Sequence, residues 1–292
     1  MDLFFKYLQY EKRYSPHTLT SYHTDLGQFA QYLNEVYQIT DAAEADHTII
    51  RSWILTLVQN NIKPRSINRK IACLRSYYRF LLAQQRIQVN PMLRIKAPKA
   101  SKKLPAFVPE EPFNNFLDSF TFEETFEGQR DRLILEFLYG TGIRLAELIG
   151  IAHADIDLRA KTVRVLGKGN KERILPLNDS LLSCLDTYRQ HKKSEFGDNN
   201  SEKLLVTNKA RPLYPKFVYR VVKKYISLIT TSENNSPHVL RHSFATHLLN
   251  KGADLNAIKD LLGHSSLAAT QVYTHNSIEK LKSIFEKAHP KA

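Results

Sequence analysis

The sequence predicts a mainly helical protein with one small antiparallel β-sheet, divided into two domains. Apolar residues recur at helical spacing through the N-terminal third. A stretch rich in proline and basic residues follows near position 100. Strand signals are confined to three short segments between positions 155 and 177. We therefore expect an all-helical N-terminal domain followed by an α+β domain.

Three helices are expected in the N-terminal domain. Ser15-Pro16 supplies an N-cap and a first-position proline. A second helix spans about Thr48–Gln59 and a third about Arg65–Gln84. The first helix is indicated by apolar residues at spacings of three and four, namely Leu19, Tyr22, Leu26, Phe29 and Leu33.

The third helix combines an apolar stripe with a basic face. The stripe consists of Ile67, Ile71, Leu74, Tyr78 and Leu81. No acidic residue occurs between His47 and Pro109, and twelve basic residues lie within Lys63–Lys103. An acid-free basic window favours a phosphate-facing surface over a solvated one. The predicted DNA contacts are Arg65, Arg69, Arg75 and Arg79 opposite the stripe, with Lys70 nearer its edge.

The domain boundary is expected in Asn90–Pro109, which contains four prolines. Proline holds itself and its predecessor in extended conformations, as in linkers. We expect domains at 1–98 and 107–292, joined by a linker at 99–106.

The second domain mixes both element types. A helix over Arg130–Tyr139 ends at Gly140-Thr141-Gly142, and Arg144 opens a short helix. The remaining helices are expected at Ser180–Lys192, about Tyr214–Ile229, from Ser236-Pro237 to Gly252, from Asp254 to Gly263, and around and after Tyr273. The strands are expected at Asp155–Leu158, Thr162–Leu166 and Glu172–Leu177, the last two joined by a glycine-containing turn.

Composition narrows the possible partners and the compartment. The net charge is +13 and the pI about 9.6, which favours polyanions. Two cysteines, Cys73 and Cys184, give no disulfide framework and fit core positions. The N-terminus lacks the basic region of a signal peptide, and no apolar run reaches a membrane span. We expect a protein of the reducing cytoplasm without membrane partners.

The start of the helix at Pro237 is suited to an anion. His238 and Arg241 share its first turn, where free N–H groups and the helix dipole already favour negative charge. Zinc is the competing interpretation, because His238 and His242 are one turn apart. Val239 stands where the zinc motif requires glutamate, and Arg241 would repel a cation. Phosphate is therefore favoured, with no metal.

Two further groups are weak signals when taken alone. Arg144 follows a glycine turn, but with Glu147 it could form an ordinary surface pair. Lys168 lies in the expected hairpin turn, where lysine is usually solvated.

In chain order, these groups and the later His264 and Tyr273 form a specific pattern. The chain resembles tyrosine recombinases of the Xer type, the XerC/XerD group, over nearly its whole length. Lys259 and Ala269 depart from the pattern, where glutamine and threonine are expected. The matching stretches are Gly140–Leu148, Gly167–Arg173, His238–Leu249, Leu261–His264 and Tyr273-Thr274-His275.

The resemblance implies a role for each residue. Tyr273 would attack the scissile phosphate and form a 3′-phosphotyrosyl link. Arg144 and Arg241 would stabilise the nonbridging oxygens, and Glu147 would orient the arginine site. Lys168 would protonate the leaving 5′ oxygen, His238 would act as base toward Tyr273, and His264 would donate to the phosphate. No cofactor and no metal would be needed.

The resemblance also implies partners and a biological role. The helical domain would be a SAM-like core-binding domain, and the two domains would form a C-shaped clamp on double-stranded DNA carrying a specific recombination site. Four protomers, identical or paired with a related recombinase, would exchange strands through a Holliday junction. Resolution of chromosome dimers at cell division would be the role, with a DNA translocase of the septum as a further partner. The final helix would then dock on a neighbouring protomer, although its apolar residues could instead cover the chain's own core.

Three alternatives stay open. An integrase of a mobile element has the same chemistry and can be as short. A non-catalytic DNA-binding protein could use the same scaffold. A type IB topoisomerase shares the active-site residues but acts as a monomer without tight sequence specificity.

Overall fold

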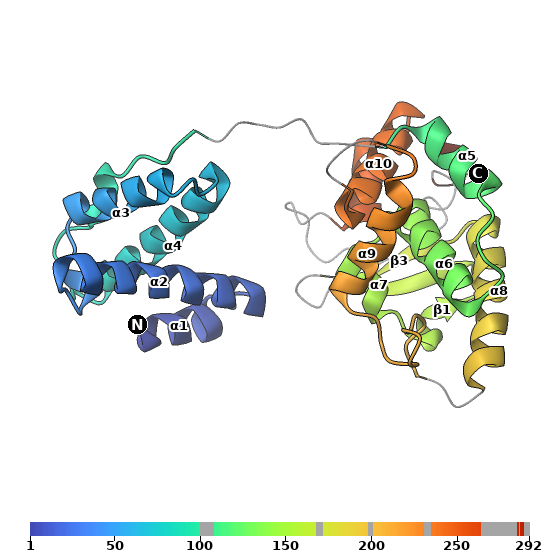
Figure 1. Ribbon diagram of the computed structural model, residues 1–292, viewed down its shortest axis with the longest axis horizontal. Helices are drawn as coiled ribbons and strands as arrows, with labels where there is room; N and C mark the ends of the chain where they lie inside the picture. Colours follow the sequence, from blue (N-terminus) through green and yellow to red (C-terminus); the bar gives the residue numbers. More distant parts are fainter. Residues whose placement is uncertain are drawn as a thin grey trace. The chain divides into compact units, whose positions relative to one another are not determined.

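The computed structural model describes residues 1–99, 108–167, 172–197, 201–230, 235–263, 285 and 287–288. The chain divides into two compact units, Met1–Lys103 and Leu104–Ala292, each with its own hydrophobic core. The predicted fold class is confirmed, since the described residues form mainly helices and one three-stranded antiparallel sheet (Figure 1). The expected linker at 99–106 lies, except for Lys99, outside the described residues and stays a prediction.

All secondary-structure elements among the first unit's described residues are helices. Ser15 caps the long helix α2 as predicted, its hydroxyl accepting a hydrogen bond from the Thr18 amide at 3.3 Å. Asp46 caps α3 in the same way through the amides of Thr48 and Ile49. The N-terminal helical turns were not predicted. The elements are α1 (Asp2–Lys6), η1 (Tyr7–Glu11), α2 (Pro16–Tyr37), η2 (Ala42–Glu44), α3 (His47–Gln59), α4 (Pro64–Ala83) and η3 (Pro91–Arg94).

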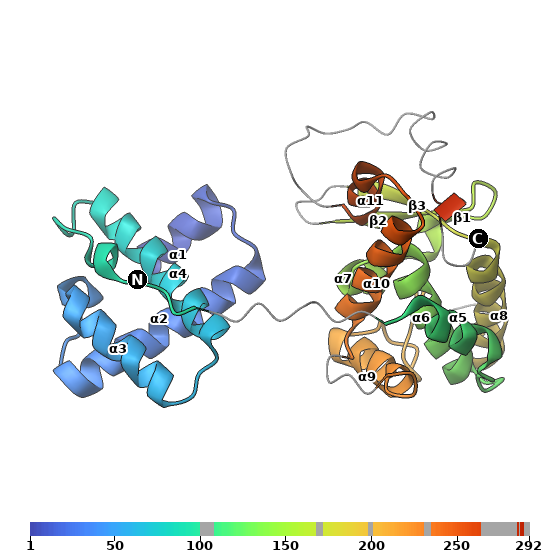
Figure 2. The same ribbon diagram turned by 90° about the horizontal axis from the view of Figure 1, so that it is seen from above.

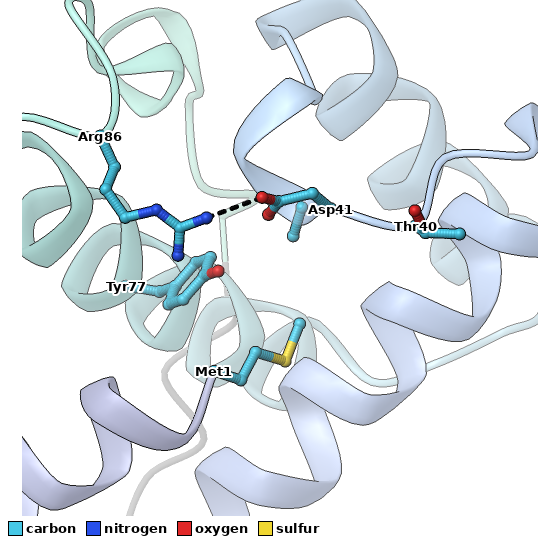
Figure 3. A pocket seen from close by; sticks show the side chains of 6 residues that line it. Met1, Thr40, Asp41, Tyr77 and Arg86 are labelled. Atoms are coloured by element: carbon cyan, nitrogen blue, oxygen red, sulfur yellow. Dashed lines mark hydrogen bonds and ion pairs between the residues drawn. The ribbon is translucent and has the colours of Figure 1, made fainter.

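Helix α4 provides much of this unit's core. All five residues of its predicted apolar stripe are buried, and α4 packs against α2 and α3. The Tyr78 hydroxyl donates to the Ala42 carbonyl at 2.7 Å, which fixes the connection between α2 and α3. Beyond the end of α4, Arg86 pairs with Asp41 at 2.7 Å beside a small pocket (Figure 3). Both side chains are half-exposed, so this pair contributes little to stability.

The second unit combines the small sheet with helices, and α7 and α11 pack against β2 and β3 respectively. The strand order is β1-β2-β3, with Val163 opposite Leu175 and Ile156 opposite Val163. Strand β1 is only two residues long, and helix α5 was not predicted. The elements are α5 (Glu110–Ser119), α6 (Phe126–Thr141), α7 (Leu145–Gly150), η4 (His153–Asp155), β1 (Ile156–Asp157), β2 (Thr162–Leu166), β3 (Glu172–Pro176), α8 (Asp179–Phe196), α9 (Pro215–Ile226), α10 (Pro237–Asn250) and α11 (Leu255–Leu262).

Helix α6 is the centre of this core. It packs against α8, α9 and α10, and its residues from Leu133 to Tyr139 are all buried, as expected of a helix covered on every side. It ends at Gly142, which has a φ of +60°. A Cβ there would lie 2.4 Å from the Phe244 ring, so only glycine fits the turn that leads to Arg144.

Two residues near the C-terminus bear on the expected final helix. Phe285 and Ala288 are buried in the core of the second unit. At these positions the segment contributes to the core of its own unit, and docking of the final helix on a neighbouring protomer stays a prediction. The preceding residues Ser277–Ile284 lie outside the described part of the chain. No helix among the described residues is both long enough and apolar enough to cross a membrane.

Candidate active site

Helix α10 carries the two cations predicted at its start. His238 is exposed in the first turn, whereas Arg241 is 8% exposed. The Arg241 guanidinium donates to the Gly142 carbonyl at 2.6 Å and to the Leu262 carbonyl. Arg241 therefore joins α10 to the end of α6 and to the end of α11.

Arg144 and Glu147 form more than a surface pair. The Glu147 side chain is 4% exposed, and it accepts from the Arg144 amide at 2.9 Å and from its guanidinium at 2.8 Å. This arrangement caps α7 and bends the Arg144 side chain back over the helix. The Arg144 guanidinium also donates to the Gly263 carbonyl at 2.8 Å. Because its side chain is 31% exposed, Arg144 can still be reached from solvent.

A third arginine, Arg173 of β3, joins this pair. Its two terminal nitrogens donate to the two Glu147 oxygens at 2.8 and 2.7 Å, and its Nε donates to the Leu261 carbonyl at 3.0 Å. Its side chain is 5% exposed. Arg173 was not among the predicted site residues, although it closes the Gly167–Arg173 stretch that carries part of the resemblance.

The C-terminal end of α11 collects all three arginines. Three successive carbonyls, those of Leu261, Leu262 and Gly263, accept from Arg173, Arg241 and Arg144 respectively. The last carbonyls of a helix lack intrahelical partners and form the negative end of its dipole, so cations are stabilised there. Gly263 adopts a left-handed conformation and a Cβ there would crowd the Arg173 side chain at 3.2 Å. In Figure 2, α11 lies beside β3, consistent with their direct contacts.

The cluster carries an excess of positive charge. Glu147 is the one carboxylate that pairs with its arginines in the described part of the chain. Burial alone would raise the pKa of Glu147, but hydrogen bonds and charge from Arg173, then from Arg144, lower it to about 2. Burial, then the charges of Arg144 and Arg173, lower the pKa of Arg241 to about 10. Arg241 thus stays charged at neutral pH. One carboxylate cannot balance three arginine side chains, so the site favours an anion.

Three predicted site residues, Lys168, His264 and Tyr273, lie outside the described residues. Their places in the chain relate them to the cluster. Lys168 belongs to the connection between β2 and β3, and His264 directly follows Gly263.

The basic face of α4 is only partly free to bind DNA. Lys70 is buried, and its ammonium donates to Asp25 at 2.8 Å and to Gln28. The expectation that Lys70 contacts DNA is wrong, because the ammonium satisfies a buried carboxylate of α2 instead. Arg69 also pairs with Asp25, at 2.5 Å, but its side chain stays 43% exposed.

The other three arginines of that face are exposed. Arg75 donates to the Ile95 carbonyl at 2.8 Å, whereas Arg65 and Arg79 lie on the solvent side of α4. Their contact with DNA stays a prediction.

A second basic surface was missed by the sequence reasoning. No acidic residue occurs from Lys203 to Ser232, and α9 lies within this window. The signal was the same acid-free window that had indicated α4. The exposed residues on α9 include Lys216, Tyr219, Arg220 and Lys223.

The described residues contain no group of three or more His, Cys, Asp or Glu side chains arranged to hold a metal ion. His238 and His242 are both exposed on α10. His247 is buried instead, with its Nδ1 2.9 Å from the Tyr139 hydroxyl.

Family models match both units. The phage integrase family matches residues 113–280, more than half of the chain, and the N-terminal SAM-like domain of phage integrases matches residues 1–85. The expectation of a SAM-like N-terminal domain is thereby confirmed.

Named relatives match the chain from end to end. The tyrosine recombinase XerC of Chlorobaculum parvum is 38% identical over 317 residues, covering 100% of this chain and 94% of that protein. XerC of Pelobacter propionicus is 39% identical, covering 98% of this chain and 93% of that protein.

Solved structures share the fold. The XerH site-specific recombinase bound to its difH substrate gives a TM-score of 0.70 at 22% identity, covering 91% of this chain and 78% of that one. The Tn1549 transposon integrase with transposon right end DNA gives 0.71 at 18% identity, covering 96% of this chain and 97% of that one. At these identities the likeness concerns the fold alone. The matches of family models and full-length relatives show that this chain belongs to the phage integrase family, the tyrosine recombinases.

Proposed function

We propose that this protein is a site-specific recombinase that resolves chromosome dimers by cutting and rejoining DNA through Tyr273. The observation that carries the proposal is the arginine cluster at the end of α11. Arg144 and Arg241 both donate to carbonyls there, and the cluster has an excess of positive charge. Gly263, at the end of α11, directly precedes His264 and lies ten residues before Tyr273. Two guanidiniums can each donate to oxygens of one phosphate group, so such a site is suited to binding phosphate.

In the cleavage step, the Tyr273 oxygen attacks the scissile phosphorus. A P–O bond to tyrosine forms, the bond to the 5′ oxygen breaks, and the DNA is left with a 3′-phosphotyrosyl link and a free 5′-hydroxyl. The phenol proton passes to His238, and Lys168 protonates the leaving oxygen. Arg144 and Arg241 neutralise the nonbridging oxygens as charge builds up in the transition state, and His264 donates a further hydrogen bond.

Rejoining is the same step in reverse, with a 5′-hydroxyl of a partner strand as the nucleophile. The energy of the phosphodiester is retained in the phosphotyrosyl bond, so neither ATP nor a metal ion is required. Exchange of strands between duplexes needs several protomers, and we propose a tetramer that passes through a Holliday junction.

DNA binding would involve both units. Exposed Arg65 and Arg79 of α4 and the basic face of α9 supply cations for phosphates, which makes binding strongly salt-dependent. The domains at 1–98 and 107–292, joined by the linker at 99–106, would bind the duplex together.

Chromosome dimer resolution is supported by the relatives. Proteins named XerC match the chain over its whole length at 36–39% identity. Recombination would take place in the cytoplasm, where a related recombinase and a DNA translocase of the septum are the proposed partners.

The test is to capture the site in genomic DNA. Protein is mixed with fragmented genomic DNA of the organism that encodes it, then denatured, and the DNA held covalently is sequenced. A resolution enzyme should capture one chromosomal site, because a dimer then contains two copies of it. Capture at the ends of a mobile element would indicate an integrase instead. No covalent capture, or equal capture by Tyr273→Phe, would overturn the proposal.

A further inference from the structure

Arg173 lies in the arginine cluster, and each of its three guanidinium nitrogens donates to a protein group. Both terminal nitrogens are engaged by Glu147 and the Nε by the Leu261 carbonyl. Its side chain is 5% exposed, against 31% for Arg144. A bidentate arginine–carboxylate pair of this kind is strong and geometrically specific. Arg173 is therefore built to hold protein groups in place.

The three contacts of Arg173 connect segments that are distant in the sequence. Strand β3 supplies Arg173, helix α7 supplies Glu147, and the end of α11 supplies Leu261. Glu147 leads to Arg144, three residues earlier, and Leu261 leads to His264, three residues later. Arg173 thus joins the segment that carries one phosphate-binding arginine to the segment that leads to the nucleophile.

The Glu147 carboxylate is shared evenly between Arg144 and Arg173. One oxygen accepts from both guanidiniums, each at 2.8 Å. The other accepts from the Arg144 amide at 2.9 Å and from Arg173 at 2.7 Å. Arg173 thereby fixes the plane of the carboxylate that orients the Arg144 side chain. Without it, the partly exposed Arg144 would be the remaining arginine partner of a buried carboxylate, and the two could pair in other geometries.

We propose that Arg173 is a positioning residue of the cleavage reaction, acting through Glu147 on the Arg144 guanidinium. The inference rests on the proposed function, since it requires Arg144 to stabilise the nonbridging oxygens. Arg173 also lies five residues after Lys168, so it could instead hold the connection that carries the general acid. The two roles differ in which step is impaired when Arg173 is lost. The first role predicts weaker stabilisation of the nonbridging oxygens, and the second predicts slower protonation of the leaving 5′ oxygen.

Three versions of one duplex separate these roles. The probe is a synthetic duplex of the genomic site captured on Tyr273. The first version has the natural scissile phosphate. The second has a methylphosphonate, which lacks the negative nonbridging charge that Arg144 would neutralise. The third has sulfur as the bridging 5′ atom, whose thiolate leaves without protonation by Lys168.

Single-turnover cleavage and DNA affinity are measured for wild type, Arg173→Met and Arg173→Lys. Arg173→Met should bind DNA normally but cleave the natural duplex about 10- to 100-fold more slowly, the usual effect of losing a residue that orients a reactive group. This loss should largely disappear with the methylphosphonate and persist with the sulfur duplex. Arg173→Lys keeps the charge without the fork and should lie between Arg173→Met and wild type.

Two further variants keep the test decisive. Glu147→Gln retains the side-chain shape, and if Arg173→Met does not fold, this variant should show the same pattern across the three duplexes. Arg130→Met is the matched control. Arg130 is also a buried arginine paired with a carboxylate, that of Asp131, but it contacts Asn208 rather than the cluster. Any loss that it causes should be equal on all three duplexes.

Recovery of Arg173→Met on the sulfur duplex would overturn the inference in favour of the Lys168 connection. An equal loss on all three duplexes, as for Arg130→Met, would reduce Arg173 to general structural support. Failure of the wild-type protein to form any covalent complex would instead refute the proposed function.

Discussion

Replacing Glu147 with glutamine should remove a measurable part of the pH dependence of the second unit's stability. The folded structure lowers the pKa of Glu147 from 4.5 to about 2, chiefly through Arg173 and Arg144 working against burial. A group whose pKa is depressed on folding contributes stability above its unfolded pKa and loses it as the pH falls toward the folded value. At ~1.4 kcal/mol per pH unit, the full contribution is about 3 kcal/mol.

Most of this contribution falls in an accessible pH range. Between pH 5 and pH 3 the wild-type protein should lose about 2 kcal/mol through Glu147 alone, in addition to what other carboxylates contribute. Glu147→Gln should not show this loss of stability between pH 5 and pH 3, and its free energy of unfolding should be lower than that of wild type at pH 7. The quantity to compare is therefore the difference between the two proteins' free energies of unfolding at each pH.

Urea unfolding followed by circular dichroism provides the measurement. Trp53, the only tryptophan of the chain, lies in the core of the first unit, so its fluorescence reports that unit's transition separately. Glu172→Gln serves as the control, because Glu172 is exposed and lies 3.7 Å from Arg164 in a surface pair worth ~0–1 kcal/mol. Parallel pH profiles for wild type and Glu147→Gln would refute the reasoning.

Four other variants test the remaining assignments. Lys70→Met should destabilise the first unit by about 1–3 kcal/mol, because the buried Asp25 carboxylate loses one of its two cation partners and keeps Arg69. The salt dependence of DNA binding should not change in the protein that remains folded. Arg65→Ala should lower the log–log salt slope by about 0.9 at little cost in stability, and an unchanged slope would place Arg65 away from DNA. Lys168→Ala should cleave natural DNA about 10²–10⁴-fold more slowly and recover on a 5′-bridging sulfur substrate, and lack of recovery would mean that another residue is the acid. Gly142→Ala should cost about 2 kcal/mol or more in urea unfolding, from left-handed strain and collision with Phe244, and a neutral effect would show that the turn can relax.

Much of the fold could be predicted because its signals are local. The cap at Ser15, the apolar stripe of α4 and the stop at Gly142 each depend on residues within a few positions of one another. Helix α5 was missed because it follows the proline-rich stretch, which indicated a linker. Strand β1 was predicted too long, since only two of its residues pair with β2.

The site was harder to predict from the sequence because its contacts join residues that are far apart in the chain. Arg144 and Arg241 were found through their positions at helix starts, but Arg173 was not, because on a strand its sequence context does not reveal burial. Its partner Glu147 lies 26 residues away. Lys70 was wrongly expected to contact DNA for the same reason, since the Asp25 carboxylate that it pairs with lies 45 residues away. An acid-free stretch of sequence predicts a basic surface, but only the folded structure shows which of its cations pair with carboxylates of the protein itself.

The most direct test of the central claim is to identify the residue that becomes attached to DNA. Protein and the captured site are incubated with EDTA, denatured and digested with nuclease and protease, and the peptides are analysed by mass spectrometry. A residual nucleotide linked through phosphate to Tyr273, absent from Tyr273→Phe and formed fully in EDTA, is the expected result. A link to any other residue, or one that forms only with added Mg²⁺, would contradict the account.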